Sequence, residues 1–162
     1  MHLFIFLIAG LCFASSSGMA AEKSGWQCWQ DAAEKYSVPV ELLYSVARVE
    51  TNNRASITSK PNNNGTYDIG LMQINSAHLP MLRKYGITKE ILLREPCVNL
   101  HIGAWIMSMS IARYGYNWRG VGAYNAGNEY YRKIYARKVM AMYERITKEK
   151  QKEESMLVAS TP

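Results

Sequence analysis

Hydrophobic and polar positions along this chain recur mostly every three or four residues, which is the period of an α-helix. The pattern predicts a first helix over residues 27–36 and a second that Pro39 opens in its first turn and that runs to about Glu50. A longer helix is predicted over residues 98–114, where Gly115 ends it. A last amphipathic helix carries its apolar stripe, which we interpret as core, on Tyr131, Tyr135, Val139, Met142 and Ile146.

The segments between these helices are shorter and richer in turn formers. Residues 54–68 contain Pro61, three successive Asn residues and Gly65, so we expect a loop there that includes a small β-hairpin near a cleft. Short helices are predicted over residues 79–85, 88–94 and 118–124. The sequence therefore predicts a mainly α fold.

The two ends of the chain differ from its middle. Residues 3–13 are apolar and are followed by small residues up to Ala21, which is typical of an export signal over residues 1–20, although the start carries no Lys or Arg. The apolar run is too short to span a bilayer, so no membrane span is expected in the mature chain. At 162 residues the chain has room for one domain, expected over residues 21–147, and the charged and polar residues 148–162 are expected to form a flexible tail.

The cysteine count fits export to an oxidising compartment. Cys12 lies inside the predicted signal, which leaves Cys28 and Cys97 in the mature chain. In such a compartment a disulfide is favoured over two free thiols or two metal ligands. No metal or cofactor is expected, because the histidines show no spacing typical of a metal site: His2, His78 and His101.

The net charge of +6 belongs entirely to the mature chain and favours an anionic partner. No nucleic-acid-binding motif is recognisable, and export also counts against nucleic acid as the partner. A wall polymer that bears carboxylates, or an anionic membrane surface, fits better. The charge is equally explained by solubility alone.

Glu50 is the candidate for chemistry in the second predicted helix. Leu43 and Ala47 lie on the same helix face, so the carboxylate extends along a largely apolar surface. Desolvation there would raise the pKa of the carboxyl and keep it protonated as a general acid. The alternative is a carboxylate at a helix end that turns into water.

Three motifs decide between these interpretations by their order and separation. Glu50-Thr51 is followed by Gly70-Leu71-Met72-Gln73-Ile74 and then by Ala123-Tyr124-Asn125-Ala126-Gly127. Together they resemble the soluble lytic transglycosylases, which have a lysozyme-like fold, over residues 26–143. The likeness is strongest to the small members associated with type III and type IV secretion, so peptidoglycan strands and proteins of a secretion apparatus are the implied partners.

The resemblance implies roles for individual residues. Glu50 would be the sole acid and base, supported by Thr51, where the family usually has Ser. The residues implied to bind substrate are Gly70, Met72, Gln73, Tyr124 and Asn125. Gly70 would allow close approach of the sugar, and the hydroxyl of Tyr124 would hold the catalytic carboxyl. The sequence departs from the usual Asn-Pro continuation at Asn53-Arg54, which would alter the rim of the cleft.

The implied reaction is cleavage of the β-1,4 bond between N-acetylmuramic acid and N-acetylglucosamine in the periplasm, with formation of a 1,6-anhydro product. Retaining glycosidases instead use a second carboxylate as the nucleophile. Asp68, just before the Gly70 motif, is therefore either a supporting catalytic residue or a solvated turn residue. A hydrolytic muramidase of the same fold and a non-catalytic wall-binding component remain as alternatives.

Overall fold

The computed structural model describes residues 25–160, and the predicted export signal over residues 1–20 lies outside them. The described chain is mainly helical with one two-stranded sheet, which confirms the predicted fold class. Its elements are α1 (Gly25–Tyr36), α2 (Val40–Thr51), β1 (Asp68–Ile69), β2 (Ile74–Asn75), η1 (Ser76–His78), α3 (Leu79–Leu82), η2 (Arg83–Tyr85), α4 (Lys89–Arg94), α5 (Pro96–Tyr114), α6 (Trp118–Gly122) and α7 (Glu129–Ala159).

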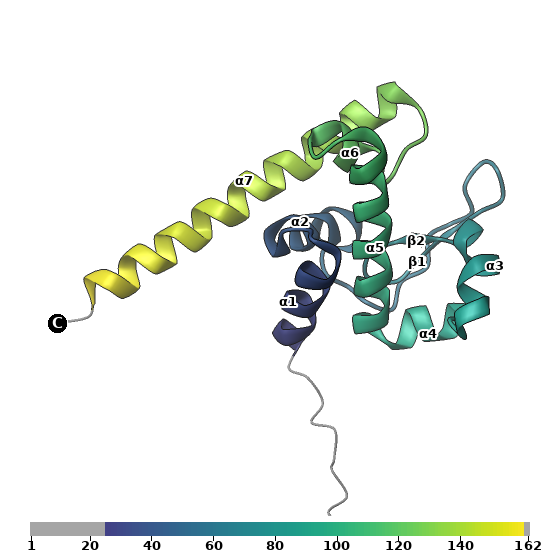
Figure 1. Cartoon of the computed structure of the whole chain (residues 1–162), viewed down its shortest axis with the longest axis horizontal. Helices are drawn as coiled ribbons and strands as arrows, with labels where there is room; N and C mark the ends of the chain where they lie inside the picture. The colour runs from purple at the N-terminus through teal and green to yellow at the C-terminus, as the bar shows by residue number, and fades with distance from the viewer. Residues whose placement is uncertain (1–24, 161–162) are drawn as a thin grey trace, which may run out of the picture.

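Helix α5 forms the centre of the fold. Pro96 begins it at a position where a missing N–H costs nothing, and Gly115 ends it with a positive φ of 93°. The helix packs against α1, α2, α4 and α6. Figure 1 shows α1 and α2 on one side of α5, with the sheet, α3 and α4 on the other. The fully buried Leu100 and Met107 of α5 therefore lie in a core shared by both sides.

Helix α2 carries the candidate acid and ends sharply. Asn52 follows its last residue in the left-handed conformation, with φ of 54°, and its N–H bonds back to the carbonyls of Ala47 and Arg48. Leu43 and Val46 are completely buried, so the helix is fixed to the core through its apolar face. Glu50 lies in the last turn of this anchored helix.

The sheet lies later in the chain than the sequence indicates. We expected a hairpin within residues 54–68, but the strands β1 and β2 flank the turn Gly70–Gln73, with Asp68 opposite Asn75. Residues 54–67 contribute only a single bridge, between Thr58 and Ile69. The turn formers of residues 54–67 led us to place the hairpin turn too early in the chain. The chain instead reverses at Gly70–Gln73, where Gly70 and Gln73 both adopt positive φ.

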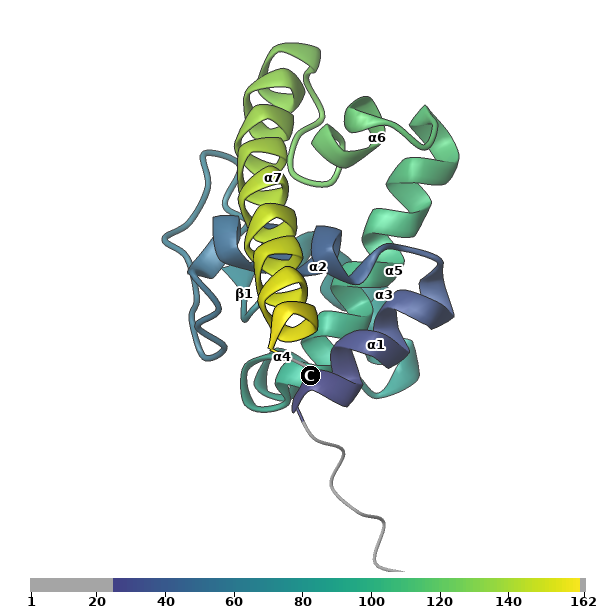
Figure 2. The same cartoon turned by 90° about the vertical axis from the view of Figure 1, so that its left-hand side faces the viewer.

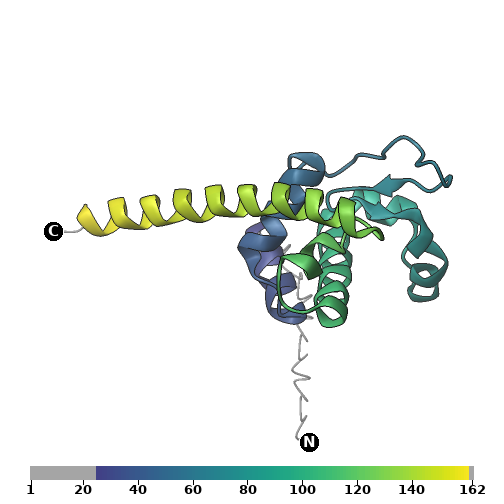
Figure 3. The ribbon, with the colours of Figure 1, turned by 90° about the horizontal axis from the view of Figure 1, so that it is seen from above.

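Helix α7 continues to Ala159 and so includes most of the segment from residue 148 that we expected to form a flexible tail. It lies over α2 in Figure 2, and it packs on α2 and α6. In the C-terminal half of α7, Lys150 Nζ lies 2.6 Å from Glu41 Oε1 of α2. Beyond this ion pair the last turns extend away from the rest of the described chain (Figure 3). No helix in residues 25–160 has the length and apolar character that crossing a membrane requires.

Candidate active site

Glu50 is largely buried between α2 and α7. The hydroxyl of Tyr135, on α7, donates a hydrogen bond of 2.6 Å to Glu50 Oε1. The side chain of Asn125 also hydrogen-bonds to the carboxyl. Two groups from the C-terminal part of the chain therefore hold the carboxyl in one orientation.

The pKa of Glu50 is raised from 4.5 to about 7, chiefly because burial removes water from the carboxylate. The hydrogen bond from Tyr135 lowers this pKa, and the negative charge of Asp68 raises it. The raised pKa agrees with the prediction from the apolar helix face. A carboxyl group with this pKa is partly protonated near neutrality and can donate a proton to a leaving group.

Asp68 is fixed at the edge of the sheet. Asn75 Nδ2, on the opposite strand, donates to its Oδ1 at 2.8 Å, and Asn62 Nδ2 lies 3.3 Å from its Oδ2. The two amides hold the side chain of Asp68 in one orientation. The side chain lines the cleft and acts electrostatically on Glu50, so it is not an isolated turn residue.

A cleft lined by Asp68 and Asn125 has a volume of about 520 Å³. Polar side chains of the loop after α2 and of the sheet lie on one side of this cleft. Residues of α5 and of the segment after α6 lie on the other side. The residues that line it are Asn62, Asn63, Asn64, Thr66, Asp68, Gln73, Ile74, Asn75, His78, Ile106, Tyr124 and Asn125. Glu50 is not one of these lining residues, and its link to the cleft is Asn125, which both lines the cleft and bonds to the acid. An open cleft with this many hydroxyl and amide groups suits a polar polymer such as a glycan.

The turn Gly70–Gln73 differs from what the sequence implied. Gln73 lines the cleft, as expected, and its amide Nε2 donates to the carbonyl of Gly70 at 2.9 Å. Met72 does not line the cleft, because its side chain is completely buried in the core. Gly70 is also buried, and the reason for glycine is internal: a Cβ there would overlap the Asn99 amide and lie 2.6 Å from the carbonyl oxygen of Leu92.

Asn99, a fully buried residue of α5, holds this turn in place. Its Nδ2 donates to the carbonyls of Ile69 and Leu92 at 2.9 and 3.0 Å, and its Oδ1 accepts from the N–H of Met72 at 2.8 Å. Two of these three bonds go to the cleft turn and its flanking strand, and the third ties them to α4. No sequence signal points to this role, since one Asn inside an apolar helical stripe looks like any other polar interruption.

Tyr135, and not Tyr124, makes the bond to Glu50 that the resemblance assigned to Tyr124. We expected the Tyr124 hydroxyl to hold the catalytic carboxyl, but it donates to the carbonyl of Met72 at 2.7 Å. Tyr135 makes the bond to Glu50 instead. The two rings stack with centroids 6.4 Å apart, so Tyr124 supports Tyr135 through its ring. Sequence reasoning missed Tyr135 because it belongs to the apolar stripe of α7.

Thr51 and His78 complete the surroundings. The buried hydroxyl of Thr51 lies 2.9 Å from the carbonyl oxygen of Leu71, so it joins the end of α2 to the cleft turn. Thr51 therefore makes this contact through a hydroxyl, the same group that a Ser at this position would supply. His78 lines the cleft, and burial lowers its pKa, which leaves a neutral imidazole near pH 7. Its isolated position in the sequence offers no reason to single it out.

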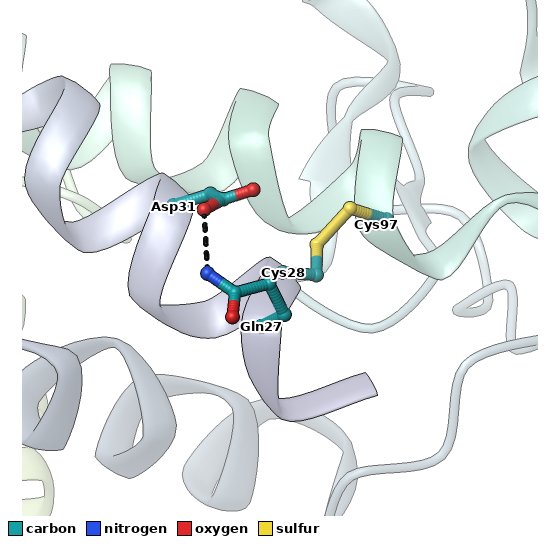
Figure 4. The surroundings of a disulfide bond; sticks show 4 residues. All are labelled: Gln27, Cys28, Asp31 and Cys97. Carbon is teal, nitrogen blue, oxygen red and sulfur yellow. Dashed lines mark hydrogen bonds between the residues drawn. A yellow bond between two sulfur atoms is a disulfide. The ribbon is translucent and has the colours of Figure 1, made fainter. Parts of the chain in front are cut away.

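The disulfide between Cys28 and Cys97 is present and joins α1 to the start of α5 (Figure 4). Beside it, Gln27 Nε2 donates to Asp31 Oδ1 at 3.0 Å. Among residues 25–160, the one grouping of potential metal ligands is Cys28, Cys97 and His101. Its two sulfurs are bonded to each other, so they lack the thiolate character that a metal site needs.

Comparison with known proteins identifies a family and several similar proteins. A family model described as "Transglycosylase SLT domain" matches residues 27–147. "Invasion protein IagB" of Salmonella typhimurium (strain SL1344) is 36% identical over 151 residues, covering 90% of this chain and 89% of that protein. "Protein IpgF" of Shigella flexneri is 37% identical, covering 92% and 95%. "Peptidoglycan-binding-like protein" of Escherichia coli O157:H7 is 37% identical, covering 86% and 84%.

Proposed function

Because this chain belongs to the transglycosylase SLT domain family, with its lysozyme-like fold, we propose that it is a peptidoglycan lytic transglycosylase with Glu50 as its acid and base. The observation that carries the proposal is the state of Glu50. This carboxyl has a pKa of about 7 and is oriented by Tyr135 and by Asn125, a residue that lines the polar cleft. A non-catalytic wall-binding protein would have no need to keep a carboxyl buried and partly protonated.

The reaction follows from one carboxyl changing its protonation state. Protonated Glu50 donates its proton to the glycosidic oxygen, so the bond from C1 of N-acetylmuramic acid breaks and N-acetylglucosamine leaves as an alcohol. The carboxylate then takes the proton of the muramyl C6 hydroxyl, whose oxygen bonds to C1. The product ends in 1,6-anhydromuramic acid, Glu50 is protonated again, and no water is consumed.

Asp68 supports this reaction by its charge. An oxocarbenium-like positive charge develops at C1 as the bond breaks, and a fixed carboxylate facing the cleft stabilises it. The amides of Asn62 and Asn75 hold Asp68 for that purpose. Gln73 and Asn125, which line the cleft, bind the sugar chain through their amides.

The place of action follows from the substrate. We propose that residues 1–20 direct export and that residues 21–147 act as the catalytic domain in the periplasm. The similarity to proteins named for invasion, IagB among them, supports a role in opening the wall locally for a secretion apparatus. Proteins of such an apparatus are the proposed partners.

The test is mass spectrometry of the muropeptides released from purified sacculi. Products that are one water lighter than reducing muropeptides, lost with Glu50→Gln while that variant stays folded, are the expected result. Predominantly reducing ends would assign the protein to the hydrolytic muramidases. Full activity of Glu50→Gln would remove Glu50 from the mechanism.

A further inference from the structure

The cleft continues beyond the site of the proposed reaction. A second cavity of about 450 Å³ shares four lining residues with the first: His78, Ile106, Tyr124 and Asn125. Its other lining residues include Trp105, Met109, Arg113, Tyr114 and Arg132. The extension therefore combines apolar side chains with two guanidinium groups, whereas the first cavity is lined mainly by amides and hydroxyls.

Arg132 is held firmly at the wall of this extension. Its Nε donates to the carbonyl of Ala126 at 2.8 Å, and its Nη2 donates to the hydroxyl of Tyr114 at 3.0 Å. Its Cζ also lies 4.2 Å from the centroid of the Tyr114 ring. The guanidinium is thus pre-organised, and little conformational entropy remains to be lost when it binds an anion.

Arg113 places a second positive charge against the same ring. Its Cζ lies 5.3 Å from the Tyr114 centroid, on the exposed side of the extension. Within the described residues no carboxylate lies within ion-pair distance of Arg113 or Arg132. The arginines that do form ion pairs there are Arg94, Arg119 and Arg145.

Two cations on one ring without a protein counter-ion favour an anionic ligand. The glycan backbone of peptidoglycan is neutral, because the lactyl group of muramic acid is joined to the stem peptide in an amide bond. The carboxylates of the polymer belong to the stem peptide. The apolar side chains of Trp105 and Met109 suit the methyl groups of its alanine residues.

We propose that Arg113 and Arg132 form a subsite for the carboxylates of the stem peptide, so that this protein prefers peptide-bearing strands to stripped ones. The proposal rests on the proposed function, since it assumes that the first cavity holds the glycan. The arginines contribute to recognition of the substrate and take no part in the bond-breaking step.

The experiment compares kcat/KM on peptide-bearing strands with kcat/KM on the same strands stripped of peptide by an amidase, after the lactyl carboxylates that the amidase exposes have been converted to methyl amides. Arg113→Gln should lower the value for peptide-bearing strands about fivefold and leave the value for stripped strands unchanged. Arg113→Lys should lose less, because it keeps the charge. The matched control is Arg137→Gln, an exposed cation of α7 outside the extension, which should behave as wild type.

A second measurement separates failure of this proposal from failure of the proposed function. Binding of a fluorescently labelled stem tetrapeptide to the uncleaving Glu50→Gln protein should weaken about fivefold when Arg113→Gln is added, and should weaken with salt. Equal losses on both kinds of strand, or unchanged peptide binding, would overturn the subsite while leaving glycan cleavage intact. If wild type cleaves neither strand, the proposed function fails and the peptide titration alone decides the subsite.

Discussion

Tyr135 donates a 2.6 Å hydrogen bond to Glu50 across 85 residues of sequence, and this bond joins the last helix of the fold to the candidate acid. The bond favours the ionised form of the carboxyl, whereas burial favours the protonated form. The pKa of about 7 is the balance of these two effects and of the charge on Asp68.

Tyr135→Phe should therefore raise the pKa of Glu50 further. A hydrogen bond to a charged group contributes about 1.5–3 kcal/mol, which corresponds to a shift of about one to two pH units. The expected result is that the alkaline limb of the pH profile of kcat/KM shifts to higher pH. The profile is measured from about pH 5 to about pH 9. Tyr124→Phe is the control, because its hydroxyl bonds to Met72 and its loss should cost about 1–3 kcal/mol of stability without moving the limb. An unmoved limb in Tyr135→Phe would contradict the assignment.

Glu50→Gln should make the protein more stable above about pH 7. The pKa of Glu50 is higher in the folded state, about 7, than its ordinary value of 4.5, so the folded protein binds more protons between these values. Wild type therefore loses stability as pH rises through this window, by up to about 3 kcal/mol. The amide of the variant does not titrate. In denaturant unfolding, the free energy of unfolding of the variant should therefore increase relative to that of wild type as pH rises from 4.5 to about 7. A constant difference across this range would show that burial does not perturb the acid.

Asp68→Asn should slow cleavage by about 100-fold without abolishing it, which is the usual cost of removing one electrostatic stabiliser. The same change should lower the pKa of Glu50, because a like charge is removed. The alkaline limb of the pH profile should move down. Asp31→Asn is the matched control, since Asp31 on α1 is the only other Asp of the sequence. Wild-type rates in Asp68→Asn would make Asp68 a structural residue of the hairpin.

Reduction of the Cys28–Cys97 disulfide should lower the thermal midpoint of the mature protein. The bridged residues are 69 positions apart, for which loop-closure entropy gives about 4 kcal/mol, or roughly 10 °C. Thermal unfolding with and without reductant measures the effect. The double variant Cys28→Ser, Cys97→Ser should unfold at the reduced midpoint under both conditions. Free thiols in protein folded under oxidising conditions would contradict the bridge.

Features that depend on local periodicity and on a short motif were predictable from the sequence. Helix α5 was expected over residues 98–114 and begins only two residues earlier, because Pro96 and Gly115 mark its ends. The helix face of Glu50 suggested burial but left a solvent-facing carboxylate as the alternative, and only the family motifs decided between them. The disulfide followed from the number of cysteines left after export.

Features that depend on tertiary contacts were not predictable in this way. Asn99 bonds to residues at least seven positions away, and Tyr135 reaches Glu50 only after α7 has packed on α2. The family resemblance implied that Met72 lines the cleft, yet its side chain is completely buried in the core. The helical continuation of α7 past residue 148 arises from strong helix formers among its charged residues, whose polarity alone indicates a solvated tail.

The disulfide also separates the residues around the cleft into two groups, those inside the covalent ring that it closes and those outside it. Residues 28–97 form a closed ring that contains Glu50, Asp68 and the exposed loop at Asn63, whereas Tyr124 and both cleft arginines lie outside the ring. A protease that cuts the loop near Asn63 would open the ring without separating the fragments. The cut protein would migrate as one species until it is reduced, and its two cleft walls would stay together.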